Sequence, residues 1–113
     1  MSRRTDQVAS VIQKVLGEEM LLLDLPAMTT ISRVEVAADM KHAKVWITVF
    51  SEDPGIEKAA LQTLQNNVYD LQGALNKNFT MHHTPRIAFA VDNSLHYASR
   101  INELLKKTNE DQE

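Results

Sequence analysis

The chain opens with apolar positions spaced three or four residues apart, which predicts an amphipathic helix from Thr5 to about Leu22. Thr5 is a suitable N-cap, because its hydroxyl can accept a hydrogen bond from a free backbone N–H of the first turn. A loop is predicted at Asp24-Leu25-Pro26, where the helical spacing ends. The apolar face of this helix carries Val8, Val11, Ile12, Val15 and Leu16.

The next two segments alternate between apolar and polar residues, as expected of two half-buried strands. The first spans Thr29 to about Val36, with Val34 and Val36 on one face and polar residues on the other. The second spans Ala43 to Phe50, and the link between the two strands is short. Such a link predicts an antiparallel hairpin. The faces of the second strand are Ala43, Val45, Ile47 and Val49 against Lys44, Trp46, Thr48 and Phe50.

Helical spacing returns after Asp53-Pro54, an N-cap followed by a proline suited to the first helical position. The pattern continues to about Asn78, but Asn66-Asn67-Val68 and Gly73 are poor helix formers and predict a kink or a break into two helices. A third strand is predicted from Arg86 to Val91. A last helix is predicted after Asp92-Asn93-Ser94, and its apolar positions are Leu95, Ala98, Ile101, Leu104 and Leu105.

The predicted order α-β-β-α-α-β-α has few strands and segregated helices, which indicates an α+β two-layer domain. A length of 113 residues allows one domain, which we place at residues 1–107, followed by a polar tail at 108–113. The absence of cysteine excludes disulfides and thiolate chemistry. The sequence shows no apolar run long enough for a membrane span and no apolar segment behind Arg3-Arg4, so we expect a cytoplasmic protein.

Residue patterns give little support for catalysis or metal binding. The chain has three glycines and no phosphate-binding loop, dinucleotide-binding string or nucleophile elbow. Its histidines lack a metal-ligand spacing, since His82 and His83 are adjacent while His42 and His96 are distant in sequence. We therefore expect no enzyme activity, no metal and no cofactor.

The formal net charge of −3 argues weakly against a nucleic-acid partner, but the charges are unevenly distributed. Acidic residues concentrate in the first quarter, the middle and the tail, whereas basic residues exceed acidic ones between Asn76 and Lys107. The net charge therefore does not decide the kind of partner. The basic residues of this stretch are Lys77, Arg86, Arg100, Lys106 and Lys107.

Several strings, taken in order, resemble the ribosome-binding factor A family of bacterial assembly factors for the small ribosomal subunit. They are residues 28–36 (MTTISRVEV), 39–47 (DMKHAKVWI), 85–89 (PRIAF) and 92–94 (DNS). The resemblance implies a type II KH-like domain of order α-β-β-α-(kink)-α-β followed by a C-terminal helix. It also implies a monomer that binds 16S rRNA on the immature 30S subunit, assists maturation of its 5′ end without catalysis and supports growth in the cold.

The interhelical kink departs from the family pattern. KH domains that grip single-stranded RNA use a Gly-x-x-Gly loop, and the ribosome-binding factors replace this loop with a kink built as alanine, any residue, then glycine. The corresponding positions here are Asn67-Val68-Tyr69. Asparagine tolerates unusual backbone angles, so a kink can still form.

The resemblance and the local charge together suggest candidate RNA-binding residues. The kink residues could instead be an exposed helix irregularity, the basic residues a solvated loop, and the N-terminal arginines a mobile tail. For Trp46 we favour cover by another element, such as the last helix, over stacking on a base. The candidates are Arg3, Arg4, Asn66, Asn67, Tyr69, Lys77, His82, His83 and Arg86.

A rival interpretation is a small protein-interaction domain without RNA, which could form a homodimer through its sheet. The negative net charge and the aromatic Trp46 and Phe50 on the second sheet face favour it. A dimer whose formation buries Trp46 would support this interpretation.

Overall fold

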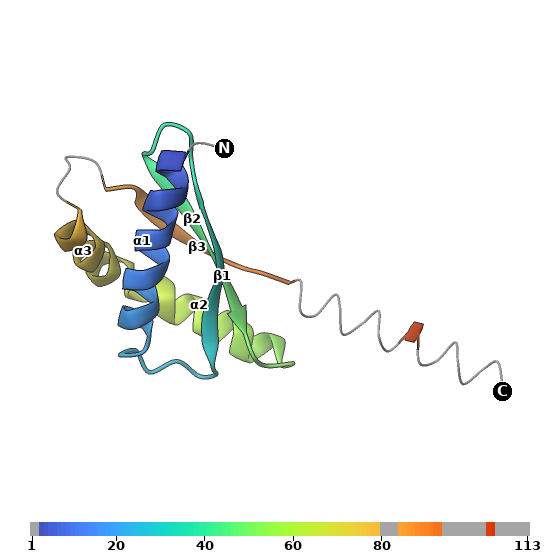
Figure 1. Cartoon of the computed structure of the whole chain (residues 1–113). Coiled ribbons are helices and arrows are strands. Elements are labelled where there is room, and N and C mark those ends of the chain that lie inside the picture. Colours follow the sequence, from blue (N-terminus) through green and yellow to red (C-terminus); the bar gives the residue numbers. More distant parts are fainter. Residues whose placement is uncertain (1–2, 80–83, 94–103, 106–113) are drawn as a thin grey trace.

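The computed structural model describes residues 3–79, 84–93 and 104–105. Within these ranges, three helices pack against a three-stranded sheet whose strand order is β1-β2-β3 (Figure 1). The prediction of an α+β two-layer domain is therefore confirmed. The helices are α1 (Arg3–Met20), α2 (Pro54–Asn66) and α3 (Val68–Asn78), and the strands are β1 (Thr29–Val36), β2 (His42–Val49) and β3 (Arg86–Val91).

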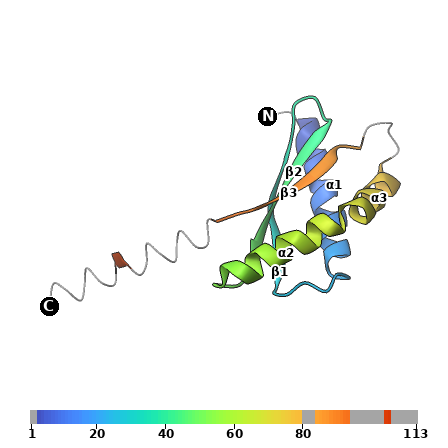
Figure 2. The ribbon, with the colours of Figure 1, turned by 180° about the vertical axis from the view of Figure 1, so that it is seen from behind.

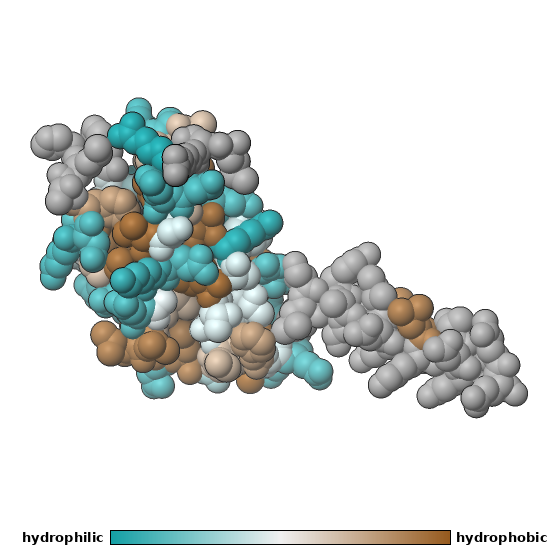
Figure 3. Space-filling view, viewed as in Figure 1, coloured by the Kyte–Doolittle hydropathy of each residue, from teal (hydrophilic) through white to brown (hydrophobic). Residues whose placement is uncertain are grey.

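Helix α1 buries Ile12, Val15 and Leu16 of the predicted apolar face, with Ile12 and Leu16 fully inaccessible to solvent. Val8 is partly buried, and the placement of Val11 on the buried face is wrong, because 37% of its surface is exposed at the edge of that face. The helix begins at Arg3, so the N-cap assigned to Thr5 is wrong and Thr5 lies within the first turn. Helix ends are the least determined part of a periodic pattern. After Met20 the chain exposes Leu21 and Leu22, and apolar atoms gather at this end of the molecule (Figure 3).

Strands β1 and β2 form the predicted antiparallel hairpin. Their pairing shifts by one residue between Ile31 and Arg33, which makes Ser32 a β-bulge. The bulge is held by the Ser32 hydroxyl, which donates a hydrogen bond of 3.1 Å to the Trp46 carbonyl. In the connecting turn, Met40 has a φ of 63°, a left-handed conformation that costs a residue with a Cβ about 1–2 kcal/mol.

Strand β3 lies parallel to β2, and α2 and α3 form the crossover between them (Figure 2). This mixed sheet is compatible with the type II KH-like topology that the family resemblance implies. Asp53 caps α2 as predicted, because its side chain accepts a hydrogen bond of 2.8 Å from the Gly55 N–H. The expected break between the two helices falls at Asn67.

All three helices share one hydrophobic core with the same face of the sheet. The buried residues of β2 alternate along the strand, so the remaining residues of β2 point to the opposite face, which we call the outer sheet face. The core comprises Ile12, Val15, Leu16, Met20, Ala43, Val45, Ile47, Val49, Ala60, Leu64, Leu71, Leu75, Ile87 and Phe89.

The C-terminal helix predicted after Ser94 falls outside the described residues, except for Leu104 and Leu105. Both of these residues are exposed, at 60% and 58% of their surface. Across the described ranges, no helix is long and apolar enough to cross a membrane.

Candidate nucleic-acid interface

The junction between α2 and α3 is built by Asn67 without a left-handed backbone. Its φ of −102° and ψ of 8° lie in the sparsely populated bridge region, which residues other than glycine can adopt. Its amide donates a hydrogen bond of 2.8 Å to the Thr63 carbonyl, so the side chain stabilises the end of α2. The kink therefore forms without the glycine of the family pattern, and the Asn67 side chain has a structural partner.

The neighbouring candidates Asn66 and Tyr69 face solvent. The Asn66 side-chain oxygen accepts a hydrogen bond of 2.9 Å from Gln62. Tyr69 is 87% exposed at the first turn of α3. An aromatic side chain this exposed is available for stacking on a base.

Tyr69 and Lys77 line one cavity of about 420 Å³ between α3 and α1, which we call the helix groove. Two acidic residues, Glu19 of α1 and Asp70 of α3, line the same cavity. The helix groove thus combines an aromatic ring and one cation with two carboxylates. Carboxylates repel phosphates, so this groove is not the uniformly basic surface that phosphate binding favours.

Arg86 lies elsewhere, at the start of β3, and is exposed. Its position is fixed by Gln72 of α3, whose side-chain nitrogen donates to the Pro85 carbonyl at 3.0 Å and whose oxygen accepts from the Ile87 N–H at 3.0 Å. The Arg86 N–H also donates to the Lys41 carbonyl at 2.9 Å. The structure thus separates two residues that are close in the sequence pattern, Lys77 and Arg86.

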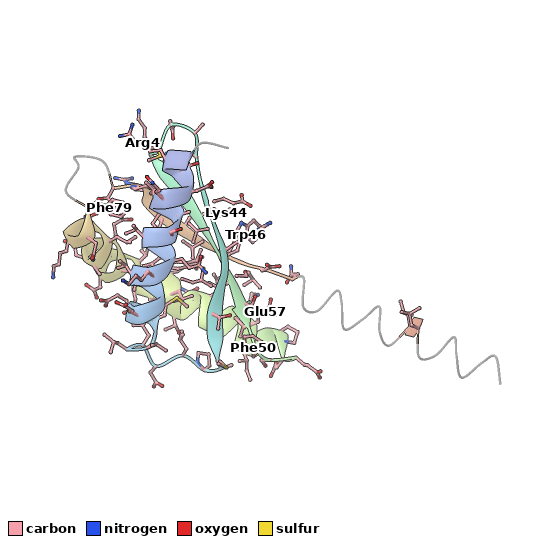
Figure 4. The ribbon with its side chains drawn as sticks, in the orientation of Figure 1. Arg4, Lys44, Trp46, Phe50, Glu57 and Phe79 are labelled. Atoms are coloured by element: carbon pink, nitrogen blue, oxygen red, sulfur yellow. The ribbon has the colours of Figure 1, made fainter. Side chains whose placement is uncertain are left out.

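The remaining candidates are only partly described. Arg4 lies in the first turn of α1, at the end of the molecule that also holds the β1–β2 turn (Figure 4). The backbone of Arg3 belongs to the same turn. His82 and His83 lie outside the described residues.

The outer sheet face gathers cations around the single tryptophan. The guanidinium carbon of Arg33 lies 4.6 Å from the centroid of the Trp46 ring, and the Lys44 Nζ lies 4.2 Å from it. Both distances fall within the range of cation–π attraction. Arg33 also forms an exposed ion pair with Glu35, with 3.4 Å between Nε and Oε1. Lys44 and Trp46 point away from α1 (Figure 4).

The sequence hypothesis missed Arg33 and Lys44. The alternation of β2 places Lys44 and Trp46 on one face, and this part could have been read from the sequence. The pairing of Arg33 with Trp46 depends on the bulge at Ser32, for which the sequence pattern gives no signal. The expectation that the last helix covers Trp46 falls outside the described residues. Within them, Arg33 and Lys44 contact the ring.

A second cavity, of about 540 Å³, adjoins this cluster at the hairpin end of the sheet. Its charged and titratable lining consists of Lys44, Arg86, His42 and Glu35. Positive groups thus outnumber carboxylates here, in contrast to the helix groove. In the described ranges, no three potential metal ligands (His, Cys, Asp or Glu) come together.

The described residues thus form a small α+β module with its helices on one sheet face and with aromatic and basic residues on its surface, features found in domains that bind nucleic acid. The sequence profile described as ribosome-binding factor A matches residues 2–105. The chain therefore belongs to the ribosome-binding factor A family, and the sequence resemblance is confirmed.

Individual relatives agree with this assignment. The ribosome-binding factor A of Legionella pneumophila (strain Lens) is 33% identical over 112 residues, which cover 95% of this chain and 88% of the relative. The ribosome-binding factor A of Caldanaerobacter subterraneus subsp. tengcongensis is 26% identical over 107 residues, which cover 95% of this chain and 87% of the relative.

A solved structure and a fitted homology model show the same fold. A solution NMR structure of a Thermotoga maritima protein, described as a putative ribosome binding factor A, has a TM-score of 0.69 at 26% identity and covers 80% of this chain and 88% of its own. A homology model of the Thermus thermophilus ribosome binding factor A, fitted into a cryo-EM map of a complex with the 30S subunit, has a TM-score of 0.62 at 25% identity, and the match covers 75% of this chain and 91% of that chain.

Proposed function

We propose that this protein binds the immature small ribosomal subunit and assists maturation of 16S rRNA, including processing of its 5′ end, without catalysing a reaction itself. The observation that carries the proposal is the family match across residues 2–105. The fitted 30S complex of the Thermus thermophilus relative supports the choice of subunit.

The proposed mechanism is selection among rRNA conformations. A factor that binds one arrangement of the RNA better than another shifts the population toward that arrangement by the difference in affinity. The factor leaves when the mature subunit no longer offers the preferred surface. In this proposal the protein acts as a cytoplasmic monomer and is needed most during growth in the cold, when misfolded RNA rearranges slowly.

The proposed contacts on the helix side are Tyr69, which can stack on an unpaired base, and Lys77, which can reach a phosphate. Asn66 and Arg4 are exposed and extend the candidate surface. Asn67 shapes the junction between α2 and α3 through its hydrogen bond to the Thr63 carbonyl. Its proposed role is to position the neighbouring residues, and not to contact the RNA itself. Arg3, His82, His83 and Arg86 complete the proposed set of RNA contacts.

Co-sedimentation with purified 30S subunits at low salt tests the binding. Wild-type protein is expected to sediment with the subunits, and its affinity should fall as salt rises. Tyr69→Ala should weaken binding, and Lys77→Gln should reduce the salt slope by about 1. Lys58→Gln, an exposed position on α2, is the matched control.

The maturation step requires a separate measurement. Cells lacking the protein are expected to accumulate 16S rRNA with an unprocessed 5′ end, most strongly at low temperature. Purified protein should leave precursor RNA intact, since the proposed role is non-catalytic. Failure of wild-type protein to sediment with 30S subunits would contradict the proposal, and a stable dimer that buries Trp46 would favour the protein-interaction alternative.

A further inference from the structure

The outer sheet face has an excess of positive charge in a chain whose net charge is negative. Arg33, Lys44 and Arg86 lie on it by strand alternation and register, and Glu35 is the carboxylate among them. Asp92 follows β3 at the opposite end of the sheet from Arg86. Over the described residues, Lys44 and Arg86 have no carboxylate partner, so two positive charges remain available to an anion.

The cations around Trp46 are held by the ring and leave donors free. Lys44 is the register partner of Glu35, yet its Nζ lies 4.2 Å from the centroid of the Trp46 ring. A cation–π contact is an electrostatic attraction between the head group and the ring, so the N–H groups of the cation can still donate hydrogen bonds to a phosphate oxygen. The arrangement keeps Arg33 and Lys44 positioned for an anionic ligand.

Trp46 itself has an unmet hydrogen-bonding requirement. Its Nε1 is buried and has no hydrogen-bond partner among the residues that the structure describes. Buried donors without a partner are rare, and each one needs an explanation. A base that takes the place of Arg33 over the ring would leave Lys44 in position for a phosphate and could offer an acceptor to this N–H.

The strand next to Trp46 leaves room for such a ligand. Ala88 is the register partner of Lys44, and Ala90 is that of Trp46, so β3 presents small side chains beside the ring. The adjoining cavity of about 540 Å³ is lined by Lys44, Ala88 and Arg86. An aromatic ring on the sheet surface, with cations and small side chains beside it, matches the chemistry of single-stranded nucleic acid.

We propose that the outer sheet face binds a single-stranded RNA segment, with one base stacked on Trp46 and neighbouring phosphates at Lys44 and Arg86. The proposal rests on the proposed function, since the small-subunit RNA is the intended source of the strand. It assigns this strand to the sheet surface opposite the helix groove, so the two surfaces can hold different segments of RNA.

Trp46 is the only tryptophan among the 113 residues, so its fluorescence reports on the proposed site alone. A short oligouridylate without secondary structure, added to the full chain at low salt, is expected to quench this emission to saturation. The apparent affinity should fall as salt rises. A flat response of the emission, with wild-type protein folded by circular dichroism, overturns the proposal.

Two variants of the proposed site and one control variant localise the binding. Lys44→Gln combined with Arg86→Gln should weaken quenching, whereas Lys14→Gln combined with Lys58→Gln removes the same charge from exposed helix positions and should change it little. Trp46→Leu should lower affinity roughly 5- to 100-fold, measured by anisotropy of a labelled oligouridylate. Equal weakening by both lysine-containing pairs would show an unspecific charge effect and would overturn the assignment.

Another occupant of the face would also be visible in the full chain. If Trp46 is shielded from acrylamide and insensitive to oligouridylate, then residues 94–113 or a second copy cover it, and the proposal fails. Sedimentation equilibrium separates these two cases by mass.

Failure of this proposal is distinguishable from failure of the proposed function. If the Trp46→Leu variant still sediments with 30S subunits like wild type and oligouridylate leaves the Trp46 emission of wild-type protein unchanged, only the sheet site is excluded. If oligouridylate quenches Trp46 but wild-type protein does not sediment with 30S subunits, the sheet site stands and the proposed function fails.

Discussion

The helix groove and the outer sheet face use similar residue types with opposite electrostatic results. In the groove, Lys77 and Tyr69 share a cavity with Glu19 and Asp70, so carboxylates outnumber the cation. On the sheet, cations surround Trp46 and one carboxylate accompanies them. The sign of each surface therefore depends on which elements the fold brings together, and the net charge of −3 describes neither region.

The largest effect is expected from a change that weakens both regions together. Ile47 is fully buried in β2, directly after Trp46, and belongs to the core that also holds α3. Ile47→Ala should lower the free energy of unfolding by about 2–5 kcal/mol, since it leaves a cavity. Urea unfolding followed by Trp46 emission measures this loss. Leu22→Ala, at a position 80% exposed, is the control and should change stability little.

A smaller loss, confined to the sheet side, is expected from Gln72→Leu. This change leaves the Pro85 carbonyl and the Ile87 N–H without the partner that positions the start of β3. Both hydrogen bonds are only partly buried, so their loss is expected to cost about 0.5–1.5 kcal/mol each. Hydrogen exchange should show faster opening of β3 while the first turns of α3 stay protected. Equal opening of both would contradict a local role for Gln72, and Gln65→Leu, at an exposed position on α2, serves as the control.

A still smaller change should reveal which partner holds Arg33. Arg33→Gln removes both the ion pair with Glu35 and the contact with the Trp46 ring, whereas Glu35→Gln removes only the ion pair. The ring contact is expected to contribute about 0.5–1 kcal/mol. Arg33→Gln should therefore destabilise more than Glu35→Gln and should shift the Trp46 emission to the red. Identical losses in the two variants would assign the effect to the ion pair.

The smallest effect on stability is expected at the helix groove. Tyr69 is 87% exposed, so Tyr69→Ala should change the free energy of unfolding by less than about 0.5 kcal/mol. The same variant should weaken 30S binding if the groove contacts RNA. Thermal unfolding and co-sedimentation, measured on one preparation, separate the two roles. A large loss of stability would show that Tyr69 packs against the fold.

The elements of this fold follow from local patterns. Alternation along the strands predicts β1 and β3 with the bounds that the structure has, and Asp53-Pro54 marks the start of α2. The break at Asn67 is also predicted, because consecutive asparagines are weak helix formers. These features depend on neighbours in sequence, and one chain is enough to recognise them.

The arrangement of the site depends on contacts that a local pattern does not contain. The hydrogen bond from Ile87 to Gln72 joins residues 15 positions apart. The contact between Arg33 and Trp46 requires a register shift that no residue type announces. The acidic lining of the helix groove arises because α1 packs beside α3 and brings Glu19 next to Asp70. Each of these features is set by tertiary packing.

The bulge at Ser32 also determines where the chain can be shortened. Ile31 pairs with Ile47 on the core side, and Val34 pairs with Val45 on the same side, although an even alternation would turn one of them outward. Deletion of Ser32 would leave Ile31, Arg33 and Val34 in strict alternation and would keep every other residue of β1 on its present face. A single-residue deletion at this position would therefore shorten β1 without exchanging the two faces of the sheet.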